Sequence, residues 1–114
     1  MGAEQSRLKD SNIHSAVELW CTDRKSAEAR YGCIEEWDTA GVTNMSRLFE
    51  NRSDFNDDIS KWNVSKVTDM SHMFHGANSF NQTLGNWNMS KVASMKGMFN
   101  RASSFNQDIG MLPK

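Results

Sequence analysis

The sequence predicts a short right-handed α/β solenoid, in which each repeat supplies one short parallel strand and one short helix, with a helical cap at the N-terminal end. Three observations predict it: a repeat of fixed length, a change of apolar spacing inside each repeat, and a non-repeating amphipathic segment ahead of the first repeat. The chain of 114 residues is long enough for one such domain. Its hydrophobic content of 38% suits a core that is one side chain deep.

The repeat is 25 residues long, because Trp37, Trp62 and Trp87 follow one another at that spacing. The copies span 34–58, 59–83 and 84–108 without insertion or deletion. A fixed period between about 20 and 50 residues is typical of solenoids, whose units bury their apolar sides against their neighbours. The other apolar columns are Ile34, Ile59, Leu84 and Ile109; Val42, Val67 and Val92; Met45, Met70 and Met95; Leu48, Met73 and Met98; Phe49, Phe74 and Phe99; and Phe55, Phe80 and Phe105.

The apolar spacing changes inside each repeat. In the middle copy, the apolar residues of the run 67–74 lie at i, i+3, i+6 and i+7, which is one face of a helix, and Ser65 precedes the run as an N-cap. Residues 80–87 lack helical spacing and predict a short strand centred on Leu84, which pairs in parallel with its equivalents in the other copies. One strand and one helix per repeat is the leucine-rich-repeat type of unit.

The chain divides into four segments. Residues 1–10 are expected to form a flexible N-terminus, 11–33 a helical N-terminal cap, 34–109 the three repeats with a final strand, and 110–114 a C-terminal tail. A cap is expected because a stack of repeats leaves apolar surface at its ends that a terminal unit must cover. We expect Trp20 and Tyr31 of the cap to pack on the first repeat.

Composition narrows the function classes. The chain carries 13 Lys and Arg against 14 Asp and Glu, and the net charge of −1 disfavours nucleic-acid binding through phosphate contacts. No apolar run reaches the length of a transmembrane helix, and no apolar segment of a secretory signal follows Met1. Cys21 and Cys33 are interpreted as two semi-buried thiols, with a disulfide as the alternative in an oxidising compartment.

The first six residues match the pattern for N-myristoylation, which makes Gly2 the lipidation candidate. A single myristoyl chain binds membranes weakly, and the neighbouring Arg7 and Lys9 add little positive charge. The alternative is a disordered polar start without lipid. The expected location is intracellular, with attachment to a membrane through the N-terminus where Gly2 is acylated.

No side-chain pattern predicts catalysis, a cofactor or a metal site. Asn56, Asn81 and Asn106 recur at one repeat position and are interpreted as a ladder that satisfies backbone groups, with a calcium-binding strip as the alternative. The acidic residues of 54–58 are interpreted as a solvated turn rather than as an acid–base pair. The protein is therefore expected not to be an enzyme.

Positions that differ between the copies predict the interaction surface, because the repeated columns are committed to packing. We also expect the C-terminal end of the stack to be uncapped and to bind a protein partner or a second copy of the chain. The candidate interaction residues are Arg47, Glu50, His72, His75, Lys96, Asn100, Met111 and Leu112.

The run WNVSKVTDMSHMF at 62–74, with Phe80-Asn81-Gln82 after it and Phe105-Asn106-Gln107-Asp108-Ile109 in the third copy, resembles the BspA-like leucine-rich-repeat surface-protein family. The resemblance covers 34–109. It implies binding or surface display without catalysis, and it transfers no functional residue.

These observations favour a non-enzymatic protein-interaction or scaffold module, such as a small structural subunit of a larger assembly. The alternative is an exported cell-surface adhesion protein, which glycans or a bond between Cys21 and Cys33 would favour.

Overall fold

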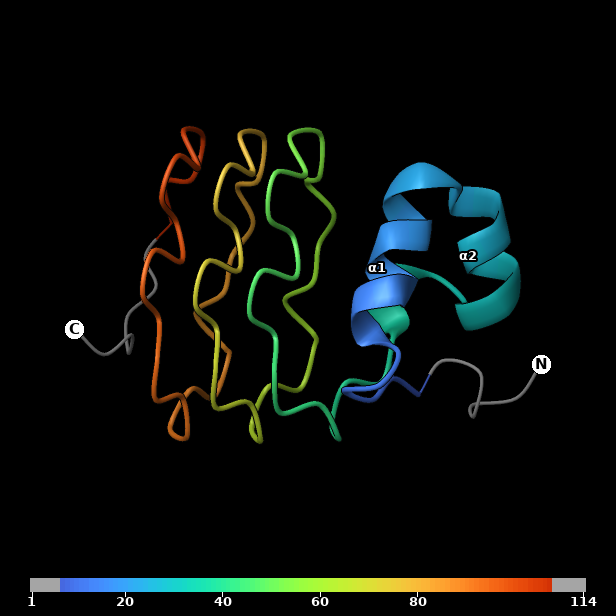
Figure 1. Ribbon diagram of the computed structural model, residues 1–114, viewed down its shortest axis with the longest axis horizontal. Coiled ribbons are helices and arrows are strands. Elements are labelled where there is room, and N and C mark those ends of the chain that lie inside the picture. The colour runs from blue at the N-terminus through green and yellow to red at the C-terminus, as the bar shows by residue number, and fades with distance from the viewer. Residues whose placement is uncertain (1–6, 108–114) are drawn as a thin grey trace.

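The structure, a computed structural model, describes residues 7–107 and contains helix α1 (Ile13–Thr22), helix α2 (Arg24–Tyr31) and the 3₁₀-helix η2 (Ile34–Glu36). From η2 onward the backbone forms three successive coils, which we name coil 1 (34–58, with η2 as its first turn), coil 2 (59–83) and coil 3 (84–107). The coils lie side by side, and the two helices lie against coil 1 (Figure 1).

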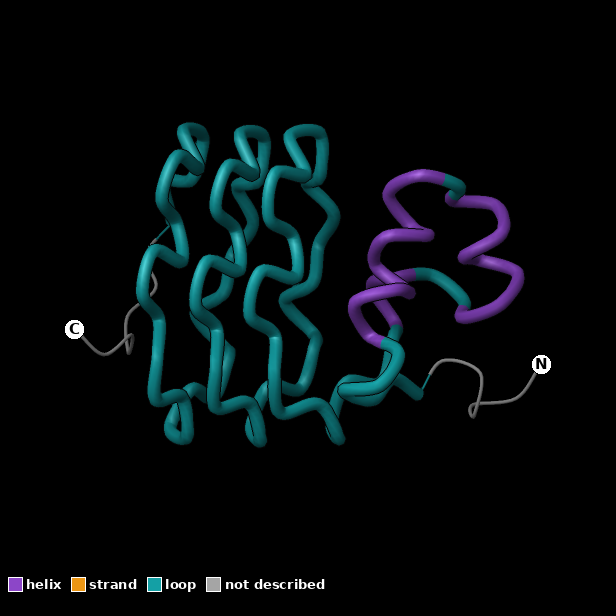
Figure 2. Tube along the Cα trace, viewed as in Figure 1, coloured by secondary structure: helices purple, strands orange, loops and turns teal. Residues whose placement is uncertain are grey.

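The predicted α/β leucine-rich-repeat solenoid is wrong. Within the described residues the coils contain no α-helix and no strand, only turns and three isolated parallel bridges (Figure 2). The Cα radius of gyration is 13.2 Å, close to the value of about 13 Å expected for a globular domain of this length. The molecule is therefore a compact body in which each coil is built from turns.

The predicted helix fails because left-handed residues interrupt each run of turns. Arg47, His72 and Gly97, which share one repeat position, have φ between 55° and 63°. A second left-handed residue follows four positions later in every coil, at Asn51, Gly76 and Arg101. A right-handed helix does not accommodate positive φ, so the apolar spacing of 67–74 is realised by successive turns.

Hydrogen bonds in these turns divide between the coil itself and its neighbour. In coil 2 the amide of Met73 donates to the carbonyl of Met70 at 3.2 Å, within the turn. The next amide, that of Phe74, donates to Met98 of coil 3 at 2.9 Å. Alternate amides thus close turns and link coils, so neither a helix nor a sheet ladder forms.

The predicted strand fails because tryptophan side chains take the carbonyl groups that a ladder would need. The indole Nε1 of Trp62 donates to the carbonyl of Ile34 at 2.8 Å, and that of Trp87 donates to Ile59 at 3.1 Å. Trp62 and Trp87 therefore bond to the preceding coil and fill the core, while Trp37 donates to the carbonyl of Gly32 in the cap at 2.9 Å. This column is buried as the repeat predicts, but by side-chain bonding to the backbone.

Aromatic ladders run along the stack. Phe49, Phe74 and Phe99 stack with ring centroids 5.5 Å apart, and the column of Phe55, Phe80 and Phe105 has spacings of 5.7 and 5.9 Å. Within each coil the two phenylalanines also stack on each other, at 4.1 to 4.2 Å. Burial of these rings therefore contributes apolar stabilisation in all three coils.

Helices α1 and α2 lie in the segment where the sequence predicts the cap. Trp20 of α1 and Tyr31 of α2 both meet Trp37 edge-on, with ring centroids 6.0 and 5.7 Å apart. Asp23 caps α2 by accepting from the amide of Ser26 at 3.3 Å. The cap thus covers the first side of coil 1. Neither of the helices that the structure describes in 7–107 has the length and apolar character needed to cross a membrane.

Residues 7–10 belong to the folded body, although the sequence places them in a flexible segment. Leu8 is fully buried, and its amide donates to the carbonyl of Asp38 at 2.8 Å. The carboxylate of Asp10 accepts from the hydroxyl of Thr43 at 2.5 Å and from the amides of Thr43 and Asn44 at 2.8 and 3.1 Å. The N-terminal boundary of the cap therefore lies earlier in the chain than residue 11.

Replacement of Trp62 tests the tryptophan column. Trp62 is 3% exposed, so we expect Trp62→Ala to lower the free energy of unfolding by about 3–5 kcal/mol. Trp62→Phe keeps most of the packing but leaves the Ile34 carbonyl without its donor, a loss of about 1–3 kcal/mol. Urea unfolding of both variants measures the difference. A Trp62→Phe variant with the same free energy of unfolding as the wild-type protein would show that the indole bond does not contribute.

Asp10 gives the protein a pH-dependent contribution to stability. The hydroxyl of Thr43, opposed by desolvation and helped by the two amides, lowers the pKa of Asp10 below its ordinary value. Since the folded-state pKa is the lower one, the stabilisation is complete above the unfolded pKa of about 3.9 and is lost as pH falls through the folded pKa.

We expect Asp10→Ala to lower the free energy of unfolding by about 1 kcal/mol at pH 7. The difference from wild type should shrink as the pH falls below that unfolded value. Asp54→Ala, which removes an exposed carboxylate, is the matched control and should change stability little. If the difference in free energy of unfolding between Asp10→Ala and wild type stays constant down to a pH of about 2.5, the assignment is contradicted.

Candidate interaction surface

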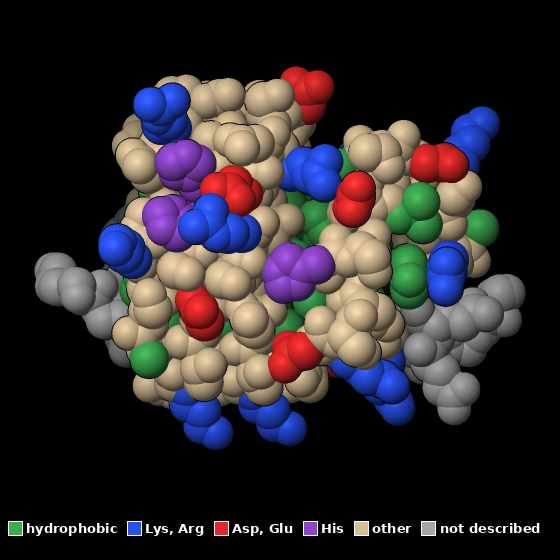
Figure 3. Space-filling model, viewed as in Figure 1, with side chains coloured by type: hydrophobic (Ala, Val, Ile, Leu, Met, Phe, Trp, Pro, Cys, Tyr) green, Lys and Arg blue, Asp and Glu red, His purple; other side chains and the backbone are tan. Residues whose placement is uncertain are grey.

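The variable positions of the three coils come together on one face of the stack. The amide of Asn51 donates to the carbonyl of His75 at 2.7 Å, and that of His72 donates to Lys96 at 2.8 Å, so the three turn runs lie against one another. Figure 3 shows two adjacent histidine side chains on this face, with Lys or Arg and Asp or Glu side chains around them. We call this the polar ridge; its members are Arg47, Glu50, His72, His75, Lys96 and Asn100.

The ridge residues of coil 1 and of coil 2 each make an internal contact. Arg47 and Glu50 form an ion pair at 2.6 Å on coil 1. On coil 2 the rings of His72 and His75 meet edge-on at 5.7 Å, and within the described residues neither Nδ1 atom has a hydrogen-bond partner although both are buried. Both residues are half-buried, in contrast to the surface positions expected from the sequence.

A glycine makes room for one histidine ring. A Cβ atom at Gly97 would lie 2.6 Å from Cε1 and Nδ1 of His72, and Gly97 has a φ of +63°. His72 is therefore packed over a position of coil 3 that accepts neither a side chain nor, without strain, an L-residue. The sequence contained this information as the unmatched Gly97 beside His72, but only the stack shows why the two occur together.

The remaining candidate residues divide by whether the structure describes them. Lys96 and Asn100 are exposed on coil 3. Gly2, Met111 and Leu112 lie outside the described residues. In the described structure, the apolar columns end in coil 3. Their last members lie at the end of the stack, although the sequence predicted them to be core residues.

The outer end of coil 3 leaves apolar side chains partly uncovered. Val92, Met95, Phe99 and Phe105 are partly exposed, whereas their equivalents in coils 1 and 2 are at most 4% exposed. We call this surface the outer end; it is defined by these four residues.

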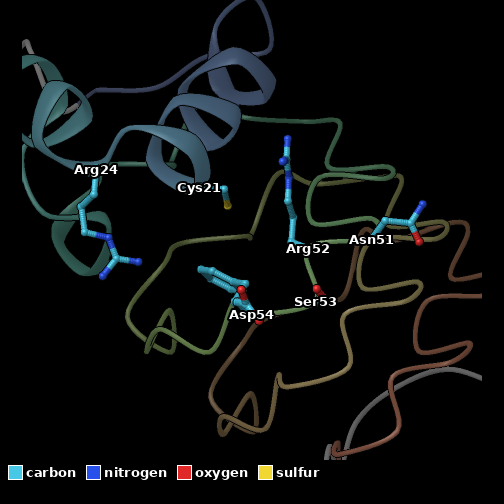
Figure 4. Close-up of a pocket in the computed structure, with 7 residues that line it drawn as sticks. Cys21, Arg24, Asn51, Arg52, Ser53 and Asp54 are labelled. Carbon is cyan, nitrogen blue, oxygen red and sulfur yellow. The ribbon is translucent and has the colours of Figure 1, made fainter.

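A hollow of about 220 Å³ lies between part of the cap and part of coil 1 (Figure 4). It is lined by Cys21 and Arg24 from the helical cap and by residues 51–55 of coil 1. Beside it, Asp57 accepts from Nε1 of Trp20 at 2.8 Å and pairs with Arg24 at 3.2 Å, which ties the cap to the coil.

The cysteines show no activated thiol and no disulfide. Cys21 and Cys33 are both free. Burial raises the pKa of the Cys21 thiol, and the charge of Arg52 offsets this only in part. Since the thiolate is the reactive form, Cys21 is a poor nucleophile at neutral pH.

The acidic turn is divided between two structural tasks. Asp57 holds the cap, while Asp58 accepts from the amide of Ser60 at 2.9 Å. The Ser60 hydroxyl and amide lower the pKa of Asp58. In the region 7–107, no three His, Cys, Asp or Glu side chains are grouped closely enough to hold a metal ion.

The asparagine column is confirmed as a backbone ladder. Oδ1 of Asn56 accepts from the amide of Asn81 at 2.8 Å, and Oδ1 of Asn81 accepts from the amide of Asn106 at 2.9 Å. Gln82 and Gln107 reinforce it by donating to Asn56 and Asn81 at 2.8 and 2.9 Å. These amide side chains are therefore used in stacking.

Alanine at Gly97 tests the packing of the ridge. Gly97→Ala combines left-handed strain with a clash against His72, and we expect a loss of about 2–4 kcal/mol. The matched control is Gly97→Ala in a His72→Ala background, compared with His72→Ala alone, because the left-handed strain remains while the ring that the added Cβ would meet is absent. There the substitution should lose about 1–2 kcal/mol. Similar losses in the two backgrounds, or unchanged ring resonances of His72 in Gly97→Ala, would contradict the close contact.

Comparison with known proteins places the chain in a family. No curated protein and no solved structure shows a significant match. A family model described as "Mycoplasma protein of unknown function, DUF285" matches residues 18–112, which include most of the cap and all three coils. On that match over most of its length, the chain belongs to the DUF285 family.

Proposed function

We propose that this protein is a non-enzymatic interaction module that binds a protein partner through the outer end of coil 3. The observation that supports the proposal is the change in burial along the apolar columns. Val92 and Phe99 are partly exposed, while Val67 and Phe74 at the same positions of coil 2 are fully buried. Side chains of one column that pack well in two coils and not in the third mark a surface prepared for contact.

The polar ridge adjoins the outer end through Lys96 and Asn100. An apolar centre with a polar margin is the usual composition of a protein–protein interface. The ridge therefore supplies the polar rim of the proposed interface, and the four apolar side chains supply its centre. In this role the protein acts as a scaffold element or a small structural subunit of a larger assembly.

The alternative proposal is adhesion at a cell surface by an exported form of the protein. Its support is the resemblance of 62–74 to the BspA-like surface proteins. The DUF285 description itself assigns no function. An intracellular protein that is attached to a membrane through an acylated Gly2 stays a separate proposal, and the intact mass of the native protein tests it.

An acidic substitution at the outer end tests the main proposal. We expect Val92→Asp to fold normally, because this side chain is already partly exposed, and to lose the partner that co-purifies with the wild-type protein from its own cells. Lys66→Asp, an exposed change on coil 2, should keep the partner. Val67→Asp places the new charge in the buried core of coil 2 and should unfold the protein. Comparison with Val92→Asp tests whether this column is buried in coil 2 and partly exposed in coil 3.

Quantitative co-purification and thermal unfolding of the four proteins measure these outcomes. Retention of the same partner by folded Val92→Asp would refute binding through the outer end. So would a wild-type protein that is recovered without any partner and shows no self-association in sedimentation.

A further inference from the structure

Four peptide groups in the turn run of coil 2 point the same way along the stack. The carbonyls of Asp69, Ser71, Met73 and His75 accept from amides of coil 1, at 2.7 to 2.9 Å. The amides that complete the same peptide groups, those of Met70, His72, Phe74 and Gly76, donate to coil 3 at 2.8 to 2.9 Å. Each peptide group therefore accepts from the preceding coil and donates to the following one.

This polarity extends to the outer end of coil 3. The carbonyls of Ser94, Lys96, Met98 and Asn100 accept from coil 2. Within the described residues the peptide bonds are all trans, so the N–H of each group points opposite to its C=O. The amides of Met95, Gly97, Phe99 and Arg101 thus point out of the stack, away from coil 2. Four aligned N–H groups make this part of the edge electropositive.

Groups of opposite polarity flank the four donors. The amides of Ala93 and Ser104 donate back to the carbonyls of Thr68 and Asn78, at 2.7 and 3.2 Å. By the same register, the carbonyls of Ala93 and Ser103 are the acceptors that a following coil would use. The edge therefore presents an ordered sequence of acceptor, four donors and acceptor.

Two copies of the chain do not match this pattern. If two outer ends meet edge to edge, the four donors of one face the four donors of the other. Head-to-tail contact fails as well, because the acceptor side of coil 1 is covered: Nε2 of His14 bonds to the carbonyl of Ser46 at 2.8 Å, and Trp20 packs on Trp37. In the described part of the chain, the helical cap of a second copy thus occupies the side of coil 1 that would have to meet the outer end.

Building on the function proposed above, we propose that the outer end binds a partner protein carrying a coil of this same 25-residue type, stacked in register as coil 3 stacks on coil 2. Such a coil presents four carbonyls to the amides of Met95, Gly97, Phe99 and Arg101. It also continues the apolar columns, with phenylalanines about 5.5 Å from Phe99. The partner coil contacts the outer end through the side from which it accepts hydrogen bonds, so that side is uncapped in the partner.

Amide hydrogen exchange of the full chain, with a synthetic peptide of residues 59–83 as the stand-in coil, tests the proposal. At a peptide concentration about ten times its dissociation constant, exchange at the four outer amides should slow about tenfold. The equivalent amides of coil 2, from Met70 to Gly76, should already be slow in the free protein. A control peptide with Phe74→Asp and Phe80→Asp should give no protection.

Three results would overturn the proposal. They are the absence of protection at any soluble concentration of the peptide, equal protection by the control peptide, and protection that appears on concentrating the protein alone. The last result would identify self-association through the same surface, and it would leave the proposed function standing. Loss of the peptide effect in Val92→Asp, with an unchanged tryptophan spectrum, would support the location of the contact.

Discussion

Hydrogen bonds along the stack axis are the interaction on which the rest of this structure depends. Alternate peptide groups in the turn run of coil 2 accept from coil 1 and donate to coil 3, so two hydrogen bonds fix the orientation of each. Turning alternate amides toward the next coil requires a left-handed residue at two positions per coil, where the chain carries Arg, Asn, His and Gly. The strained positions are therefore a consequence of the stacking, and the neighbouring coil maintains them.

Tryptophan completes the arrangement where the backbone alone does not. The carbonyls of Ile34 and Ile59 face the following coil, and the indole N–H of Trp62 and of Trp87 reaches them. One side chain thus combines a large apolar surface with a hydrogen bond to a buried acceptor. Phenylalanine or leucine at this column would fill part of the volume but would leave a carbonyl unsatisfied, which explains why the repeat uses tryptophan here in every copy.

The sequence predicted which side chains are buried and failed to predict the backbone between them. Columns such as Val67, Met70 and Phe74 repeat every 25 residues, and all are buried in coil 2. The cap was also predictable, since Trp20 and Tyr31 precede the repeats in amphipathic helices. Helices and strands were not, because apolar spacing reports the direction of a side chain and not the partner of each amide. At the ridge, one repeat position carries Arg47, His72 and Gly97 in the three copies. The sequence showed that this position varies, but it did not show that the ring of His72 packs over Gly97.

The two ends of the stack differ for a physical reason. At the first coil, the cap supplies hydrogen-bond donors and aromatic rings that contact coil 1. The carboxylate of Asp10 also accepts hydrogen bonds from the amides of Thr43 and Asn44. At the last coil, the same columns end in partly exposed Val92 and Phe99. Because the repeated columns give every interface in the stack the same chemistry, in the proposed complex they would specify the kind of coil that binds but not which protein supplies it. In that complex the choice of protein would fall to the ridge residues next to the outer end, where Lys96 and Asn100 differ from their equivalents in the other coils.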